Sequence, residues 1–200
     1  MAKIGISRRD VLRSLAVGAT AGSVLTMIPA QAAEFAHELV QKEKAAAAGK
    51  YVPKFFPANQ YEALVSLCDT IIPKDEQSGG AVEAGAPEFI DLITSENTDF
   101  QTQLGGGLMW LDNHCVDEFG KVYMQCTPEQ RKTTLDLIAY RKNGKATPGL
   151  LPGIAFFVTL RNMTCDGFYT SKIGIADLQY IGNTSRTEFP GCPPVPERQA

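Results

Sequence analysis

The chain has 200 residues, of which 44% are hydrophobic, so it is long enough to bury the core of one domain. It carries 19 basic and 22 acidic residues, a formal net charge of −3. The first 32 residues hold four of the bases and one of the acids, which leaves 15 bases and 21 acids in residues 33–200. This acidic body argues against a nucleic-acid partner, because phosphate recognition needs clustered Lys and Arg.

Residues 1–32 have the features of an export leader. The segment Ser7–Arg13 contains a polar residue, two arginines, a variable residue, two apolar residues and a further base, which is the twin-arginine pattern. Arg8 and Arg9 are the predicted export signal, an address read by the twin-arginine translocase. The mildly apolar stretch that follows is too short for a stable membrane span, which needs roughly 20 residues. We expect a periplasmic protein.

A small-x-small motif, Ala30-Gln31-Ala32, closes the leader and predicts cleavage between Ala32 and Ala33. The twin-arginine route moves proteins that have already folded, usually because a cofactor was inserted before export. A folded passenger that has no cofactor motif of its own is expected to accompany a partner that has one.

Residues 33–54 are the predicted N-terminal arm. Residues 34–50 are rich in Ala and Lys, which favour helix, and Gly49 suits a helix stop. The pattern fits either a short amphipathic helix or a loosely held arm.

The predicted helical domain covers residues 55–182. Apolar residues from Tyr61 to Ile72 recur at three- and four-residue steps, the mark of one buried helical face, and Pro73 ends this helix. The segment Ala86-Pro87-Glu88 predicts the start of a second helix, with proline in the first turn.

A third helix is predicted from an Asp99 cap to Phe119. The glycine run 105–107 weakens it by about 1 kcal/mol per glycine relative to alanine. Close packing of another backbone explains such glycines. A phosphate-binding loop is the alternative, although the spacing matches neither known fingerprint.

Two further helices complete the domain. Thr127-Pro128-Glu129-Gln130 predicts a helix start with a capping box, and Asn143-Gly144 is expected to break that helix. The apolar run Leu150–Leu160 predicts a central buried helix that continues to Tyr169, although its β-branched and aromatic residues also fit a strand at Ala155–Leu160. Residues 183–200 are rich in Pro and Gly and predict an extended, irregular C-terminal tail. The expected fold is a mainly α, single-domain helical bundle.

Motifs for a bound cofactor are missing from the sequence. It contains no G-x-G-x-x-G for a flavin or nicotinamide, no C-x-x-C-H for covalent haem and no G-x-S-x-G nucleophile elbow. The best available metal constellation is His114 and Cys115, with Asp112 and Cys126 near in sequence. Adjacent helical residues point about 100° apart, so His114 and Cys115 are poorly placed to share one ion. We expect no cofactor, metal or catalytic residue in this chain.

The five cysteines lack C-x-x-C spacing. In an oxidising compartment they can form two bridges and leave one thiol, which is either buried or paired with another chain. The candidates for disulfides are Cys115, Cys126, Cys165 and Cys192.

Asp69 is a carboxylate inside an apolar helix. It must be paired, act as a cap, or lie at a protein boundary, because unpaired burial of a charge is costly.

The segment Leu64–Glu76 resembles the signature of the gluconate 2-dehydrogenase subunit 3 family, in which an apolar helix ends in Asp-Thr-Ile-Ile-Pro. The resemblance assigns Asp69, Ile71, Ile72 and Pro73 to the family signature or to a partner contact. The order of the other segments is similar too, from the twin-arginine leader through the Thr-Pro-Glu-Gln helix to the irregular tail.

The resemblance implies a small, non-catalytic subunit of a membrane-associated dehydrogenase for sugars or sugar acids. Its partners are expected to be a large FAD-containing catalytic subunit and often a multihaem cytochrome c subunit. FAD and haem c then belong to those partners, and the small subunit assists the folding and export of the flavin subunit.

Two other functions stay open at this point. One is a stand-alone periplasmic helical enzyme with a site around His114, Cys115 and Asp112. The other is an envelope binding module whose Pro-rich tail docks on another protein.

Overall fold

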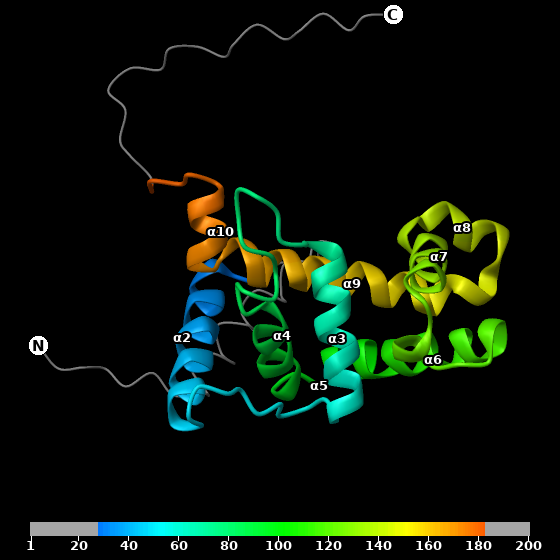
Figure 1. Ribbon diagram of the computed structural model, residues 1–200, viewed down its shortest axis with the longest axis horizontal. Helices are drawn as coiled ribbons and strands as arrows, with labels where there is room; N and C mark the ends of the chain where they lie inside the picture. The colour runs from blue at the N-terminus through cyan, green and yellow to red at the C-terminus, as the bar shows by residue number, and fades with distance from the viewer. Residues whose placement is uncertain (1–27, 183–200) are drawn as a thin grey trace, which may run out of the picture.

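The computed structural model describes residues 28–182, and these residues are helical without any β-strand (Figure 1). The mainly α expectation is therefore confirmed. Arg8, Arg9 and the tail with Cys192 lie outside the described residues. The elements are α2 (Ala30–Ala46), α3 (Ala58–Ile71), α4 (Ala86–Ser95), α5 (Thr98–Phe100), the π-helical turn η1 (Gln101–Gly105), α6 (Gly106–Phe119), the 3-10 turn η2 (Tyr123–Gln125), α7 (Pro128–Ala139), α8 (Arg141–Ala146), the 3-10 turn η3 (Pro148–Leu150), α9 (Leu151–Tyr169) and α10 (Lys172–Asp177). Within this part of the chain, no helix has both the length and the hydrophobicity needed to cross a membrane.

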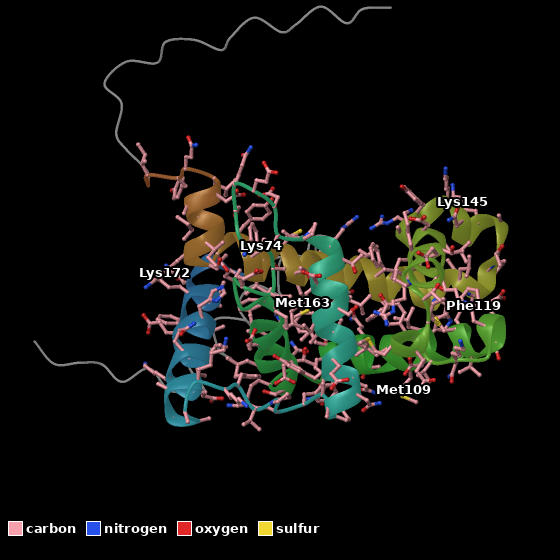
Figure 2. The ribbon with its side chains drawn as sticks, in the orientation of Figure 1. Lys74, Met109, Phe119, Lys145, Met163 and Lys172 are labelled. Atoms are coloured by element: carbon pink, nitrogen blue, oxygen red, sulfur yellow. The ribbon has the colours of Figure 1, made fainter. Side chains whose placement is uncertain are left out.

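Helix α9 is the centre of the domain and runs along its long axis, with α2 and α10 near one end and α6, α7 and α8 near the other (Figure 1). Its side chains Phe156, Leu160 and Met163 are buried. Met163 lies in the middle of the molecule, whereas exposed Lys145 lies near its edge (Figure 2). The strand alternative for this segment is wrong, because the apolar residues form one continuous helix that other helices cover from several sides.

Glycines allow α6 and α9 to approach closely. A Cβ atom on Gly107 would lie 2.1 Å from Cδ2 of Phe156, and one on Gly153 would lie 2.2 Å from Cζ3 of Trp110. The space left by each glycine is filled by an aromatic ring of the facing helix, not by a second backbone. Of the glycine run, buried Gly107 therefore serves the packing of α6 on α9.

The helix boundaries agree only in part with those predicted from the sequence. Thr127 accepts a hydrogen bond from the Gln130 N–H at 3.3 Å, and the Gln130 side chain accepts one from the Thr127 N–H at 2.9 Å, so the capping box is confirmed. The predicted Asp99 cap is wrong, since the side chain of Asn97 accepts from two backbone N–H groups there. The expected break at Asn143-Gly144 is also misplaced, because α7 ends at Ala139 and this dipeptide lies inside α8.

Helix α2 belongs to the core. Ala32, Ala33 and Ala36 have no exposed surface, and Val40 is also buried. The ring of His37 stacks on Phe89 of α4, with ring centroids 5.0 Å apart. Of the two expectations for residues 34–50, the structure has the helix, which begins earlier than predicted and is tightly held.

The segment between α2 and α3 is fixed by one buried carboxylate. Asp91 on α4 has no exposed surface and accepts hydrogen bonds from the Tyr51 hydroxyl at 2.8 Å and from the backbone N–H groups of Lys54, Phe55 and Phe56 at 2.6, 3.1 and 3.0 Å. These bonds place the start of α3 against α4. The position of α3 in turn determines the shape of the surface described next.

Candidate partner-binding groove

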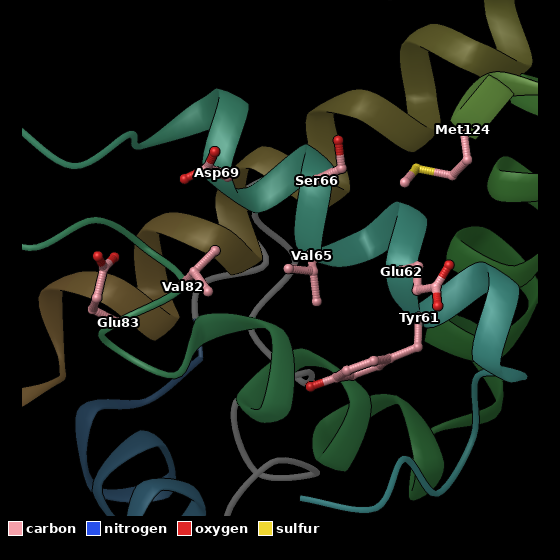
Figure 3. A pocket seen from close by; sticks show the side chains of 8 residues that line it. All are labelled: Tyr61, Glu62, Val65, Ser66, Asp69, Val82, Glu83 and Met124. Carbon is pink, nitrogen blue, oxygen red and sulfur yellow. The ribbon is translucent and has the colours of Figure 1, made fainter. Parts of the chain in front are cut away.

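A groove runs along the outer face of α3, between that helix, the loop that follows it and η2. It has a volume of about 680 Å³ and is open to solvent. The lining side chains come from all three segments and are labelled in Figure 3; they are Tyr61, Glu62, Val65, Ser66, Asp69, Val82, Glu83 and Met124.

The helical period places the polar residues of α3 on this groove. Glu62, Ser66 and Asp69 are spaced four and three residues apart, so they lie along one face. The opposite face carries Leu64 and Leu67, which are buried in the core. The outer stripe of α3 therefore stays accessible while the inner stripe fixes the helix.

Asp69, the acid of the family signature, is exposed on the rim of the groove. Within residues 28–182 its carboxylate forms neither a hydrogen bond nor an ion pair, and it caps no helix. The boundary interpretation of Asp69 fits this position, and the pairing and capping interpretations find no contact in the described part of the chain.

The other signature residues make the turn that forms the second wall. Ile71 and Ile72 are half-buried, and the carbonyl of Ile72 accepts from the Ala81 N–H at 2.9 Å. Glycine is needed at position 80, where the two chain segments meet, since a Cβ there would lie 2.6 Å from the backbone nitrogen of Lys74. Exposed Pro73 ends the helix, and the chain folds back beside α3.

Glu83 stands on that second wall. It accepts from the Gly80 N–H at 3.1 Å, and its other oxygen lies 3.7 Å from Nζ of Lys74. Hydrogen bonds from backbone N–H groups, with Lys74 nearby, hold the pKa of Glu83 below its usual value. The acid is thus ionised at neutral pH and fixed in place.

The third wall, η2, is tied to α3 by Arg131 of α7. Its guanidinium donates to the carbonyls of Tyr123, Cys126 and Met124 at 3.1, 3.2 and 2.5 Å. It also donates to the Ser66 hydroxyl at 3.4 Å. One side chain therefore sets the distance between α3 and the Met124 side chain across the groove.

Tyr61 closes the groove on the side of α4. Burial, followed by the charges of Glu88 and Asp91, raises the pKa of the Tyr61 phenol far above its usual value, so the ring is neutral. The groove thus presents apolar surface from Tyr61, Val65, Val82 and Met124, bordered by the carboxylates of Glu62, Asp69 and Glu83. Such a surface is suited to a segment that carries both Lys or Arg and an apolar side chain.

The constellation His114, Cys115 and Asp112 does not form a site. The His114 ring stacks on Trp110 with centroids 5.0 Å apart, the Cys115 sulfur lies 3.8 Å from the Thr134 hydroxyl, and Asp112 accepts from the Tyr123 N–H at 3.0 Å. Each group therefore faces a different partner. Among the described residues, no group of three or more His, Cys, Asp or Glu side chains is arranged to hold a metal ion.

The cysteines within residues 28–182 carry free thiols in this structure, including three of the four disulfide candidates. Burial raises the pKa of the Cys68 thiol to about 12 and that of Cys115 to about 11. Cys126 lies next to Cys115 and is itself buried. Buried thiols with raised pKa values are poor nucleophiles.

Several groove residues escaped the sequence analysis. Glu62 and Ser66 lie three to seven residues before Asp69, so the polar stripe on α3 is the signal that identifies them. Glu83 and Met124 carry no such signal, because folding alone brings them to α3.

Comparison with known proteins agrees with the signature. The family described as gluconate 2-dehydrogenase subunit 3 matches residues 58–191, a range that begins at α3 and includes every residue of the groove. No curated protein and no solved structure matches the chain. Because the match covers most of the sequence, the chain belongs to the gluconate 2-dehydrogenase subunit 3 family.

Proposed function

We propose that this chain is the non-catalytic small subunit of a membrane-associated, FAD-dependent dehydrogenase, and that it binds the large flavin subunit through the groove on α3. Family membership supports the role of accessory subunit in such a dehydrogenase. One observation supports the groove as the surface that binds the flavin subunit: Asp69, an acid of the family signature, is exposed on the groove rim.

The chemistry of the groove indicates what it binds. Carboxylates on the rim speed association with a basic segment and select for it, whereas apolar contacts at the centre supply most of the affinity. The partner segment should therefore carry Lys or Arg beside a bulky apolar side chain. In this proposal FAD is bound by the large subunit, and haem c by a multihaem cytochrome c subunit where one is present.

The proposal extends to export. The twin-arginine pattern at Arg8 and Arg9 supports a route on which the small subunit helps the flavin subunit to fold and carries it to the periplasm. There the assembled complex associates with the membrane through its partner subunits. The flavin subunit is then expected to have no leader of its own.

Co-purification tests the proposal directly. The tagged chain is purified from its native host, and whatever is recovered with it is assayed for FAD absorbance and subunit ratio. Stoichiometric recovery of a yellow complex is expected. Recovery of the small chain alone contradicts the role of accessory subunit.

Charge reversal tests the groove separately. Glu62→Lys combined with Asp69→Lys is expected to weaken binding of the flavin subunit at least tenfold, because like charges would then face each other. Asp117→Lys combined with Glu118→Lys, at exposed positions of α6, is the matched control and should bind normally. Equal binding by both double variants would move the interface elsewhere while leaving the accessory role intact.

A further inference from the structure

The bond predicted for leader cleavage, between Ala32 and Ala33, lies in the first turn of α2. Both residues have no exposed surface, and Ala36 one turn later has none either. The Ala33 N–H donates to the Pro29 carbonyl at 3.0 Å, so the bond is part of a closed helical turn.

The fold also includes residues on the leader side of that bond. The side chain of Ile28 is buried, with 8% of its surface exposed. The Ile28 N–H donates to Oδ2 of Asp166 on α9 at 3.2 Å. A cut after Ala32 would therefore remove residues that contact the core.

The rest of α2 is held along its length. Nε2 of His37 lies 3.0 Å from the Thr170 hydroxyl, just beyond the end of α9. Lys44 forms an ion pair with Glu88 of α4 at 2.6 Å, with both side chains largely buried. Exposing the Ala32–Ala33 bond thus requires the first turn of α2 to unwind and its buried alanines to leave the core.

A peptidase binds its substrate as an extended strand, whose backbone can pair with the enzyme as an added β-strand does. A helical, buried bond does not offer that conformation, and local opening of a core helix is rare. We infer that the Ala32–Ala33 bond is not hydrolysed once this domain has folded, and that residues 28–32 remain part of the folded subunit. The consequence for leader removal rests on the export route proposed above. The protection of the Ala32–Ala33 bond is a property of the fold and does not depend on that route.

A cleavage assay with purified signal peptidase tests this inference without any partner. The full chain, kept from export by Arg8→Lys and Arg9→Lys, is incubated with the enzyme in detergent micelles and followed by intact mass. A synthetic peptide of residues 20–45 is the matched substrate. The peptide should be cut after Ala32, and the folded chain at least a hundredfold more slowly.

A core variant shows that folding is the cause. Val40→Asp places a charge in the buried face of α2 and should release the helix, so cleavage after Ala32 should approach the rate of the peptide. Hydrogen exchange of the unsubstituted chain supplies a second measurement, in which the amides of Ala33 and Ala36 should be protected like those of α9.

Three results would overturn the inference: cutting of the folded chain at the peptide's rate, fast exchange of the α2 amides, or a peptide that is itself not cut after Ala32. Failure to capture a flavoprotein would contradict the proposed function and leave these measurements unaffected.

Discussion

The Tyr51 hydroxyl donates a 2.8 Å hydrogen bond to Oδ2 of Asp91, a carboxylate without any exposed surface. Three backbone N–H groups complete the set of donors around it. This arrangement joins the approach to α3 to the buried helix α4. Its loss should therefore affect the whole domain.

We expect Asp91→Asn to destabilise the protein by about 3 kcal/mol, because the amide NH₂ would face donors and the charge-assisted bonds would be lost. Tyr51→Phe removes a single donor and should cost about 1 kcal/mol. Urea unfolding followed by circular dichroism measures both. Equal losses for the two variants would show that the backbone donors contribute little.

Glycine-to-alanine changes in α6 should have opposite signs one residue apart. Gly107→Ala places a Cβ 2.1 Å from the Phe156 ring and should cost roughly 1–3 kcal/mol through overpacking. At Gly106 a Cβ would meet nothing within 4 Å, so Gly106→Ala should stabilise the helix by about 0.5–1 kcal/mol. Thermal unfolding of the two variants measures both effects. A stabilised Gly107→Ala protein would refute the close packing of α6 on α9.

The capping box of α7 gives a third measurement. Thr127→Ala removes the side-chain acceptor for the Gln130 N–H and should lower stability by about 1 kcal/mol. Thr133→Ala is the matched control, since that hydroxyl bonds only the Glu129 carbonyl within the same helix at an exposed position. Its effect should be small, because alanine favours helix more than threonine does. A loss at Thr133 as large as that at Thr127 would contradict the assigned cap.

His37 should make stability depend on pH. Burial lowers the pKa of the folded His37 below its usual value of 6.5, with a smaller opposing effect of a backbone hydrogen bond at Gly167. Below pH 6.5 the unfolded chain therefore binds more protons at this position than the folded chain does, so the unfolding free energy rises with pH up to about 6.5 and then levels off. The contribution of His37 is lost as the pH falls through that range.

The matched variant for this prediction is His37→Gln, which keeps a polar group near Thr170 but does not titrate. Unfolding free energies measured between pH 5 and pH 8 should show a shallower slope for the variant than for the unsubstituted protein. An unchanged slope would place the pH dependence on other groups.

Much of the fold could be predicted because several helices have both a period and a clear boundary. The helix before Pro73 and the helix after Thr127 combine apolar residues at three- and four-residue steps with a local start or stop signal. The central helix α9 was predicted with a strand as alternative, because a fully buried apolar run fits both. Only the packing of α4 and α6 on α9 decides between them.

The errors have physical reasons. Asn97 and Asp99 are both good caps, and the extended backbone of Asn97 determines which one serves. The dipeptide Asn143-Gly144 reads locally as a break, but Gly144 lies within α8, where the absence of a side chain leaves room for Leu151 and Ile154. Neither effect is visible in a short window of sequence.

The groove, too, could be predicted only in part from the sequence. Its α3 residues follow from the helical period, but Met124 reaches them through the bonds that Arg131 makes to η2. The role of Asp91 has no local signal, since its donors lie 35 to 40 residues earlier in the chain.

The bond between Ile28 and Asp166 joins positions 138 residues apart, and that between His37 and Thr170 spans 133. The first helix described thus depends on partners that are synthesised near the end of the chain. Its contacts with α4, such as that of His37 with Phe89, can form earlier, but the bonds to Asp166 and Thr170 can form only after α9 has left the ribosome. The first residues described therefore reach their final set of contacts only when the C-terminal part of the domain has been made.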